Sequence, residues 1–166
     1  MSAGRHGEYA GEPPIDVVSD LDVLAPLFRV AVIALLADCQ ADGMDAVVHE
    51  SYRSLATAKV YFARGRTTIP PHGTVTNAPD ETRSWHGYGL AVDVISAARG
   101  WEAGELWFQR LGRKAAAHGL SWGGNWKKPD LPHVQFGRCK DSPSDEARML
   151  LATQGMEAVW KAVHAI

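Results

Sequence analysis

The sequence predicts an α+β fold: a single small domain in which a mostly antiparallel sheet packs against helices. Three observations favour this class. Short apolar runs typical of strands lie far apart along the chain, at residues 44–50, 90–95 and 133–136. The longer segments between them repeat apolar residues at three- and four-residue steps, as amphipathic helices do. The chain has 166 residues, which suits one domain with a substantial core.

The N-terminal part is expected to be an arm followed by a helix. Residues 1–14 are polar and glycine-rich, so we expect a flexible arm there and one folded domain over residues 15–166. Ser19 or Asp20 can cap a helix that runs to about Cys39, where the sequence Ala-Asp-Gly ends it.

The middle of the chain is expected to contain a helix, a loop and a strand. Ser54 can cap a helix over residues 55–65, which Gly65 stops. Residues 66–82 contain three prolines and many small polar residues. We expect a long loop there, and loops of that length in compact domains are usually functional or disordered. The strand at 90–95 follows.

The last third of the chain is expected to be mostly helical. Residues 103–119 form an amphipathic pattern with Gly119 at its end, which predicts a helix. The short strand at 133–136 comes next. Ser144 can then cap one or two closing helices that reach residue 166.

Composition and charge exclude several classes of protein. A net charge of −2 gives no broad basic surface, so nucleic acid is not an expected partner. The most apolar stretch is interrupted by Arg29 and is too short to span a bilayer, so we expect no stable membrane insertion. Cys39 and Cys139 form neither a CxxC pair nor a disulfide framework, and we expect reduced thiols. The N-terminus does not resemble a signal peptide.

Asp93 is the residue of the apolar 90–95 run that needs a chemical explanation. An ionised carboxylate in a strand buried on both faces is unfavourable unless it is paired, hydrogen-bonded or bound to a metal. A bond to an arginine or to backbone amides would be enough. However, His86 is joined to this strand through Gly87 and Gly89, which allow the backbone to bend and bring the imidazole over the carboxylate.

A second histidine begins the run at 133–136. Two neutral imidazoles and a carboxylate are a common ligand set for catalytic zinc, so His86, Asp93 and His133 are candidate ligands. Asp130 lies three residues before His133 in a proline-stiffened segment. It would lie beside the metal as a second acid group, able to take a proton from water.

These residues resemble the motifs of one family. SWHGYGLAVD (84–93) fits the pattern S-x-H-x-x-G-x-A-x-D, and DLPH (130–133) fits D-x-P-H. Both patterns belong to the zinc D,D-carboxypeptidases and L-alanyl-D-glutamate endopeptidases, which cleave peptidoglycan. SYRS (51–54) resembles the arginine motif of this family, and WGGNW (122–126) resembles its tryptophan-glycine turn. The resemblance covers about residues 44–136.

The resemblance implies a role for each matching residue. It implies Zn²⁺ bound by His86, Asp93 and His133, with Asp130 as the general base and Arg53 as the cation that steadies the oxyanion. A surface pairing of Arg53 with Glu50 is the alternative. It also implies the zinc D,D-peptidase (hedgehog-like) fold, with residues 15–166 as the catalytic domain.

Several neighbouring residues have no assigned role at this point. Ser84 could hydrogen-bond near the site or cap a loop. Trp122 and Trp126 could wall a cleft or pack in the core, and nothing in the spacing of His49 and His72 brings them to the site. The chain also departs from the family, because Val-Gln follows the last histidine where Phe-Glu is usual, and the connection before Asp130 is about one residue shorter.

The resemblance implies a zinc-dependent peptidoglycan endopeptidase of the endolysin type, which hydrolyses the L-Ala–D-Glu bond of the stem peptide in bacterial cell-wall lysis. The alternative is a D,D-carboxypeptidase that removes terminal D-Ala. A third possibility is a zinc-stabilised cell-wall-binding module, against which Asp130 argues, because structural zinc sites usually have four protein ligands. We expect a monomer that stays in the cytoplasm of the producing bacterial host until holin-type release.

Overall fold

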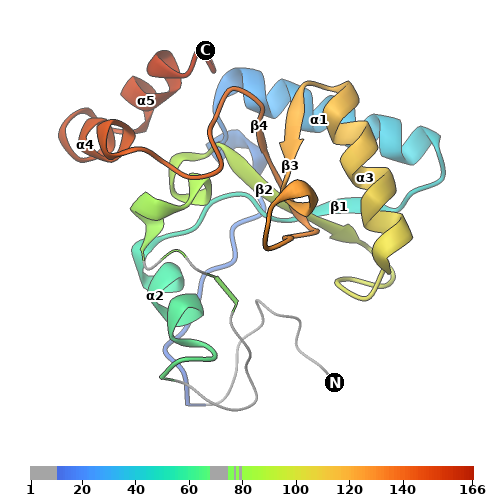
Figure 1. Ribbon diagram of the computed structural model, residues 1–166, viewed down its shortest axis with the longest axis horizontal. Coiled ribbons are helices and arrows are strands. Elements are labelled where there is room, and N and C mark those ends of the chain that lie inside the picture. Colours follow the sequence, from blue (N-terminus) through green and yellow to red (C-terminus); the bar gives the residue numbers. More distant parts are fainter. Residues whose placement is uncertain (1–10, 68–74, 77, 79) are drawn as a thin grey trace.

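The computed structural model describes residues 11–67, 75, 76, 78 and 80–166. Its centre is a four-stranded antiparallel sheet with the strand order β1-β2-β4-β3 (Figure 1). The expected α+β class with a mostly antiparallel sheet is therefore confirmed. The strands are β1 (Ala46–Glu50), β2 (Ala91–Ser96), β3 (Leu120–Trp122) and β4 (His133–Phe136). The helices are α1 (Pro26–Ala41), α2 (Leu55–Ala63), α3 (Glu105–Ala117), α4 (Asp145–Gln154) and α5 (Met156–Ala162).

The start of the first helix differs from the prediction. Asp20 does act as a cap, but of a short 3₁₀ turn, η1 (Leu21–Val23), in which it accepts a hydrogen bond from the backbone N–H of Asp22. Helix α1 begins only at Pro26. The physical reason is that a residue before proline is driven out of the helical region, and Ala25 accordingly has a ψ of 137°. The prediction of one continuous helix from residue 19 or 20 was wrong.

The caps of two later helices are confirmed. Ser54 accepts a hydrogen bond from the N–H of Thr57 at the start of α2, and Ser144 accepts one from Ala147 at the start of α4. The C-terminal region forms two helices, α4 and α5, on either side of Gly155. Strand β3 was not predicted, because three residues are too few for a periodic pattern to be recognised.

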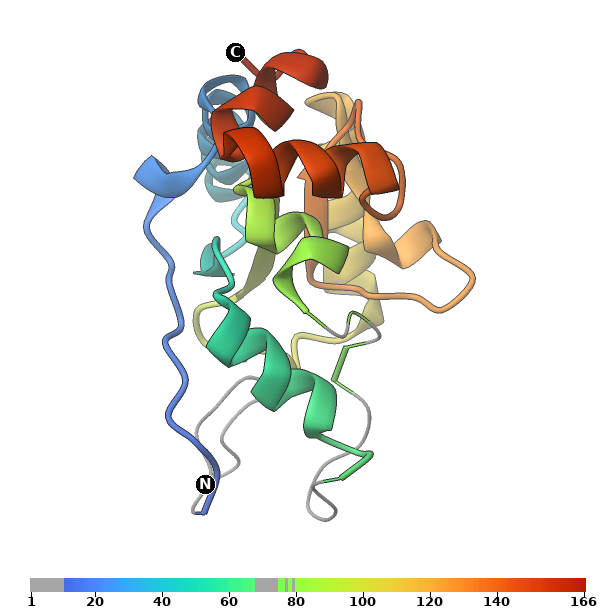
Figure 2. The ribbon, with the colours of Figure 1, turned by 90° about the vertical axis from the view of Figure 1, so that its left-hand side faces the viewer.

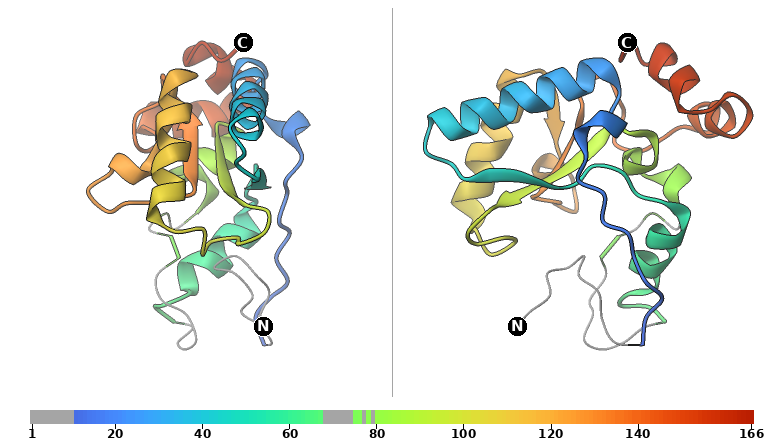
Figure 3. Two further views of the ribbon diagram at one scale, coloured as in Figure 1. Left: turned by 90° about the vertical axis from the view of Figure 1, so that its right-hand side faces the viewer. Right: turned by 180° about the vertical axis from the view of Figure 1, so that it is seen from behind.

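The two faces of the sheet have different roles. Val92 and Val134 lie opposite each other in the register of β2 and β4 and point into the apolar core. Figure 3 shows the helices that cover this face, with α1 over the β1 side and α3 over the β3 side. Because side chains alternate along a strand, the residues between these core positions point to the opposite face. That face carries the polar buried residues Glu50, Asp93, His133 and Gln135.

The N-terminal segment, as far as it is described, runs alongside α2 (Figure 2). Residues 1–10 of the expected arm lie outside the described residues. Glu12 forms an ion pair with Arg64 at 2.8 Å, and the Arg64 side chain is fully buried. Val18 forms an isolated bridge with Tyr52.

Cys39 is buried and Cys139 is partly buried, and neither is in a disulfide. None of the described helices has both the length and the apolar character that crossing a membrane requires.

Candidate metal centre

The polar face of the sheet brings three predicted site residues into register. Asp93 of β2 lies opposite His133 of β4 and, on its other side, opposite Glu50 of β1. A bulge between Val48 and Glu50 shifts the register of β1 so that the Glu50 carboxylate joins this face. The backbone hydrogen bonds of the sheet therefore fix the spacing between these side chains.

His86 reaches this face from a short 3₁₀ turn, η3 (Trp85–Tyr88). The Ser84 hydroxyl caps the turn by accepting a hydrogen bond from the His86 N–H. Gly89 ends it in the left-handed region, with a φ of 65°. At Gly87 a Cβ atom would lie 2.1 Å from the carbonyl oxygen of Glu81. Both glycines are thus required by the turn that carries His86, as the sequence indicated.

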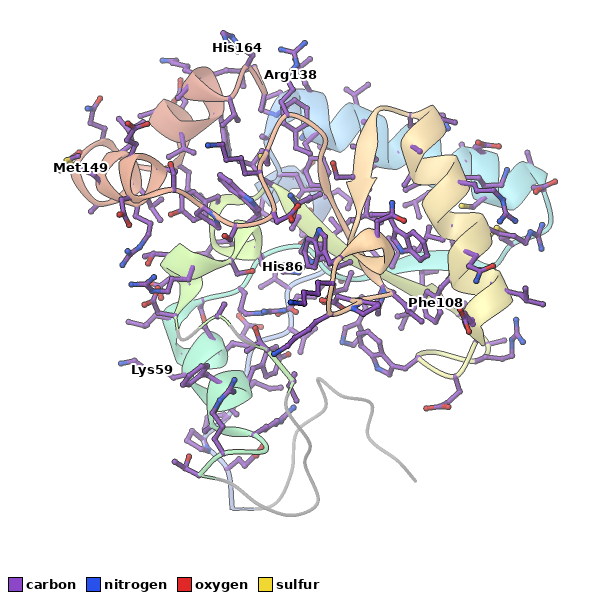
Figure 4. All side chains as sticks on the ribbon, in the orientation of Figure 1. Lys59, His86, Phe108, Arg138, Met149 and His164 are labelled. Atoms are coloured by element: carbon purple, nitrogen blue, oxygen red, sulfur yellow. The ribbon has the colours of Figure 1, made fainter. Side chains whose placement is uncertain are left out.

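The three candidate ligands form one buried cluster. Figure 4 labels His86, which lies near the centre of the molecule. His86 Nε2 lies 3.4 Å from Asp93 Oδ1, and His133 Nδ1 lies 3.8 Å from the same oxygen. The two imidazole rings meet edge to face, with centroids 5.1 Å apart. One ligand atom from each residue lies within 4.8 Å of the other two.

The chemistry of this cluster fits a zinc ion. Burial lowers the pKa of His133, and the neighbouring His86 lowers it further, so the imidazole is neutral at pH 7 and offers a lone pair. The Nδ1 atom of His86 is buried and has no hydrogen-bond partner among the described residues. Two imidazoles and a carboxylate that converge in a buried site suit tetrahedral zinc with one position left open.

Arg53 is buried beside this cluster and is not a surface residue. Its guanidinium binds Glu50 through two hydrogen bonds of 2.6 and 3.2 Å, and its Nη2 lies 3.7 Å from Asp93 Oδ2. Burial by itself would lower the pKa of Arg53, but the Glu50 carboxylate more than reverses this and keeps the guanidinium charged. Arg53 therefore pairs with Glu50 and also lies beside the candidate ligands, so the two alternatives do not exclude each other.

A cleft of about 800 Å³ opens onto the cluster. Asp130 lines this cleft together with His86, Asp93 and His133, and its role as a general base stays a prediction. The Trp126 ring lies 4.8 Å from that of His133 and forms part of the wall. Besides Arg53, three basic residues line the cleft: Arg83, Lys127 and Lys128.

The structure shows where the residues without an assigned role lie. Trp122 is not among the residues that line the cleft, and its indole N–H donates to the Leu131 carbonyl at 2.7 Å. His49 lies at the β1 bulge with its ring 5.0 Å from that of Trp101, a cleft residue. His72 lies outside the described residues.

Two residues at the site were missed as functional candidates. Glu50 holds Arg53, and Gln135 contacts the His133 ring at 2.9 Å. The signals were present, because Glu50 lies three residues before Arg53 and Gln135 lies two residues after His133 on the same face of a strand.

Comparisons with known proteins agree with this geometry. A family model described as D-alanyl-D-alanine carboxypeptidase matches residues 78–136, the segment that contains all three candidate ligands and Asp130. The peptidoglycan L-alanyl-D-glutamate endopeptidase CwlK of Bacillus subtilis (strain 168) is 27% identical over 125 residues, which are 68% of this chain and 73% of that protein.

Solved structures also resemble this chain. The LdcB LD-carboxypeptidase superposes with a TM-score of 0.50 at 14% identity, covering 83% of this chain and 68% of that one. This likeness bears on the fold alone. The L-Ala D-Glu endopeptidase ChiX of Serratia marcescens has a TM-score of 0.41 at 26% identity, covering 72% of this chain and 80% of that one.

Proposed function

Because this chain belongs to the family of zinc D,D-carboxypeptidases and L-alanyl-D-glutamate endopeptidases, we propose that it hydrolyses the L-Ala–D-Glu bond of the peptidoglycan stem peptide. The observation that carries the proposal is the buried cluster of His86, Asp93 and His133 at the wall of a cleft that also contains Asp130. The choice of bond follows CwlK, the relative that is similar over 68% of the chain.

His86, Asp93 and His133 are the residues that would hold zinc. When bound, zinc supplies Lewis-acid polarisation of the peptide carbonyl and lowers the pKa of a water molecule towards ~7. Asp130 takes a proton from the attacking water and delivers it to the amine of D-Glu as the C–N bond breaks. No serine or cysteine nucleophile is needed.

Arg53 stabilises the negative charge that develops on the carbonyl oxygen. Glu50 fixes its guanidinium in a buried position, so the positive charge does not have to reorganise during the reaction.

The test is mass spectrometry of muropeptides released from purified sacculi. Digestion should expose new N-terminal amines on D-Glu and release no free D-Ala. The same digestion with the Asp130→Asn variant serves as the control for contaminating hydrolases. If the purified protein binds zinc and sacculi but cuts no bond, the non-catalytic wall-binding alternative replaces this proposal.

A D,D-carboxypeptidase is the second candidate function. The observation that favours it is the presence of Arg83, Lys127 and Lys128 at the cleft, because a carboxypeptidase must hold the terminal carboxylate of its substrate. The matching family model carries the same activity in its description. Release of free D-Ala without new D-Glu amines would establish this activity instead.

We also propose that the enzyme acts in cell lysis as a monomer, released from the cytoplasm of the producing bacterial host through a holin-type opening. The proposal is tested by expressing the protein in a bacterial cytoplasm with and without a holin. Lysis should require both proteins together with an intact Asp130. Lysis by the enzyme without a holin would show another route to the wall, and light scattering of the purified protein reports its oligomeric state.

A further inference from the structure

Gln135 is a buried residue that the mechanism above does not use. It lies two residues after His133 in β4, on the same face of the sheet, and its side chain is completely shielded from solvent. Its amide has two hydrogen-bond contacts: Oε1 lies 2.9 Å from His133 Nε2, and Nε2 donates to the Lys140 carbonyl at 2.8 Å. An amide placed between an imidazole and a carbonyl can control which ring nitrogen carries the proton.

The Lys140 carbonyl decides the orientation of this amide. A carbonyl oxygen can only accept, so the NH₂ group of Gln135 must face it. The reversed amide would place two acceptor oxygens against each other in a buried site, which is strongly unfavourable. The oxygen of the amide is therefore the atom that faces the imidazole of His133.

This orientation also decides the tautomer of His133. Because Gln135 Oε1 is an acceptor, the Nε2 atom of His133 must carry the hydrogen and donate it. The Nδ1 atom then keeps its lone pair, and Nδ1 is the nitrogen that lies 3.8 Å from Asp93 Oδ1 in the candidate metal site.

The Lys140 carbonyl also binds the segment that carries His86. The indole N–H of Trp85, the residue before His86, donates to the Lys140 carbonyl at 2.7 Å. One carbonyl oxygen with two lone pairs thus accepts from both segments that carry the candidate histidine ligands. The position of Lys140 fixes η3 and β4 relative to each other at their ligand-bearing residues.

We propose that Gln135, anchored on the Lys140 carbonyl, is a positioning residue that presents Nδ1 of His133 to the metal. The inference rests on the proposed zinc site, because it assigns the atom through which His133 binds. Outer partners that orient a metal-binding histidine typically change metal affinity by about 10- to 100-fold when they are removed.

The first experiment is ¹H–¹⁵N NMR of the zinc-loaded protein, with the His133 resonances assigned by comparison with His133→Ala. We expect a hydrogen on Nε2 of His133 that exchanges slowly with solvent, because it is buried and hydrogen-bonded. A hydrogen on Nδ1 would overturn the inference while leaving the proposed reaction intact. Failure of the wild-type chain to bind zinc at all would instead overturn the proposed function.

The second experiment measures zinc affinity by competition with a chelator. Gln135→Leu, which has a similar size and no polar atoms, should bind zinc about 10- to 100-fold more weakly than the wild type. The control is Gln109→Leu in α3, whose amide donates a hydrogen bond to Glu105 on the same helix and which should bind zinc normally. Wild-type affinity and slow exchange of the His133 N–H in folded Gln135→Leu would rule out the positioning role.

Discussion

At the scale of single residues, the site depends on how one buried carboxylate is surrounded. Asp93 is 2% exposed and lies within 4 Å of nitrogen atoms of His86, His133 and Arg53. Arg53 supplies a permanent positive charge, while the two imidazoles supply lone pairs for a cation. The carboxylate is therefore stable in the protein interior because of neighbours on three different segments of the chain.

Asp130 should act on protons and not hold the metal. Asp130→Asn keeps the size of the side chain and removes its ability to take a proton, so the rate should fall on the order of 10²-fold or more with zinc stoichiometry unchanged. The measurements are kcat on a stem-peptide substrate and elemental analysis. Asp145→Asn, at an exposed position of α4, is the matched control. Near-normal turnover of Asp130→Asn would remove Asp130 from the mechanism.

Arg53 should require its planar guanidinium and not merely a positive charge. Arg53→Lys keeps a charge near Asp93 but loses the two-pronged contact with Glu50, so the cation is no longer held in place. We expect zinc binding to persist and kcat/KM to fall on the order of 10²-fold, as for the loss of an oxyanion-stabilising group. An unchanged kcat/KM would reduce Arg53 to a structural partner of Glu50.

At the scale of elements, α2 is attached to the rest of the molecule by buried charges. Tyr61 of α2 lies between two guanidinium groups, with Arg53 4.9 Å and Arg64 5.2 Å from its ring centre. Glu50 pairs with Arg53, and Glu12 pairs with Arg64. The segment that carries Glu12 is thereby connected through α2 to the guanidinium at the site.

Removal of the charge of Glu12 should destabilise this arrangement. Glu12→Gln replaces the carboxylate that pairs with the fully buried guanidinium of Arg64 by a neutral amide, which should lower the free energy of unfolding by about 3 kcal/mol. Urea denaturation measures the change. Glu157→Gln breaks an exposed pair with Lys161 and should change stability by less than about 1 kcal/mol. Equal effects of the two substitutions would contradict the role given to the buried pair.

At the scale of the whole molecule, one face of the sheet contributes to the stability of the fold and the other carries the candidate site. Its apolar face packs against α1 and α3 in the main core, while its polar face carries the candidate ligands and opens onto the cleft. None of the three candidate ligands belongs to the hydrophobic core, so we expect the fold to form without zinc, unlike that of a small zinc finger.

Removal of zinc should therefore abolish hydrolysis without unfolding the protein. After chelation, circular dichroism should retain its native form, while the melting temperature should fall on the order of 10 °C. The reason is that a ligand present at 1,000 times its Kd stabilises by about 4 kcal/mol, and 1 kcal/mol is worth about 2–4 °C in a chain of this size. Added zinc should restore both quantities. Full activity of a metal-free preparation, confirmed by elemental analysis, would exclude a zinc mechanism.

The sequence by itself determined much of the local structure and the set of candidate ligands. The caps Ser54 and Ser144 were predictable because a hydroxyl before a helix satisfies N–H groups only a few residues away. Asp93 was identifiable because a charge in an apolar strand needs a partner. His86 was identifiable because two nearby glycines allow the backbone to bend and bring its imidazole over the Asp93 carboxylate. Each of these inferences depends on residues close together in the sequence.

Only the tertiary structure decided how distant segments meet. The bulge that places Glu50 opposite Asp93 depends on the pairing of β1 with β2, which lie far apart in the chain. The burial of Arg53 and the pairing of the three-residue β3 with β4 likewise depend on how the segments pack in three dimensions. The orientation of the Gln135 amide depends on one carbonyl, that of Lys140, whose position is set by the loop after β4. Sequence patterns record which side chains share a face, but strand register and single hydrogen bonds are fixed by packing of the whole chain.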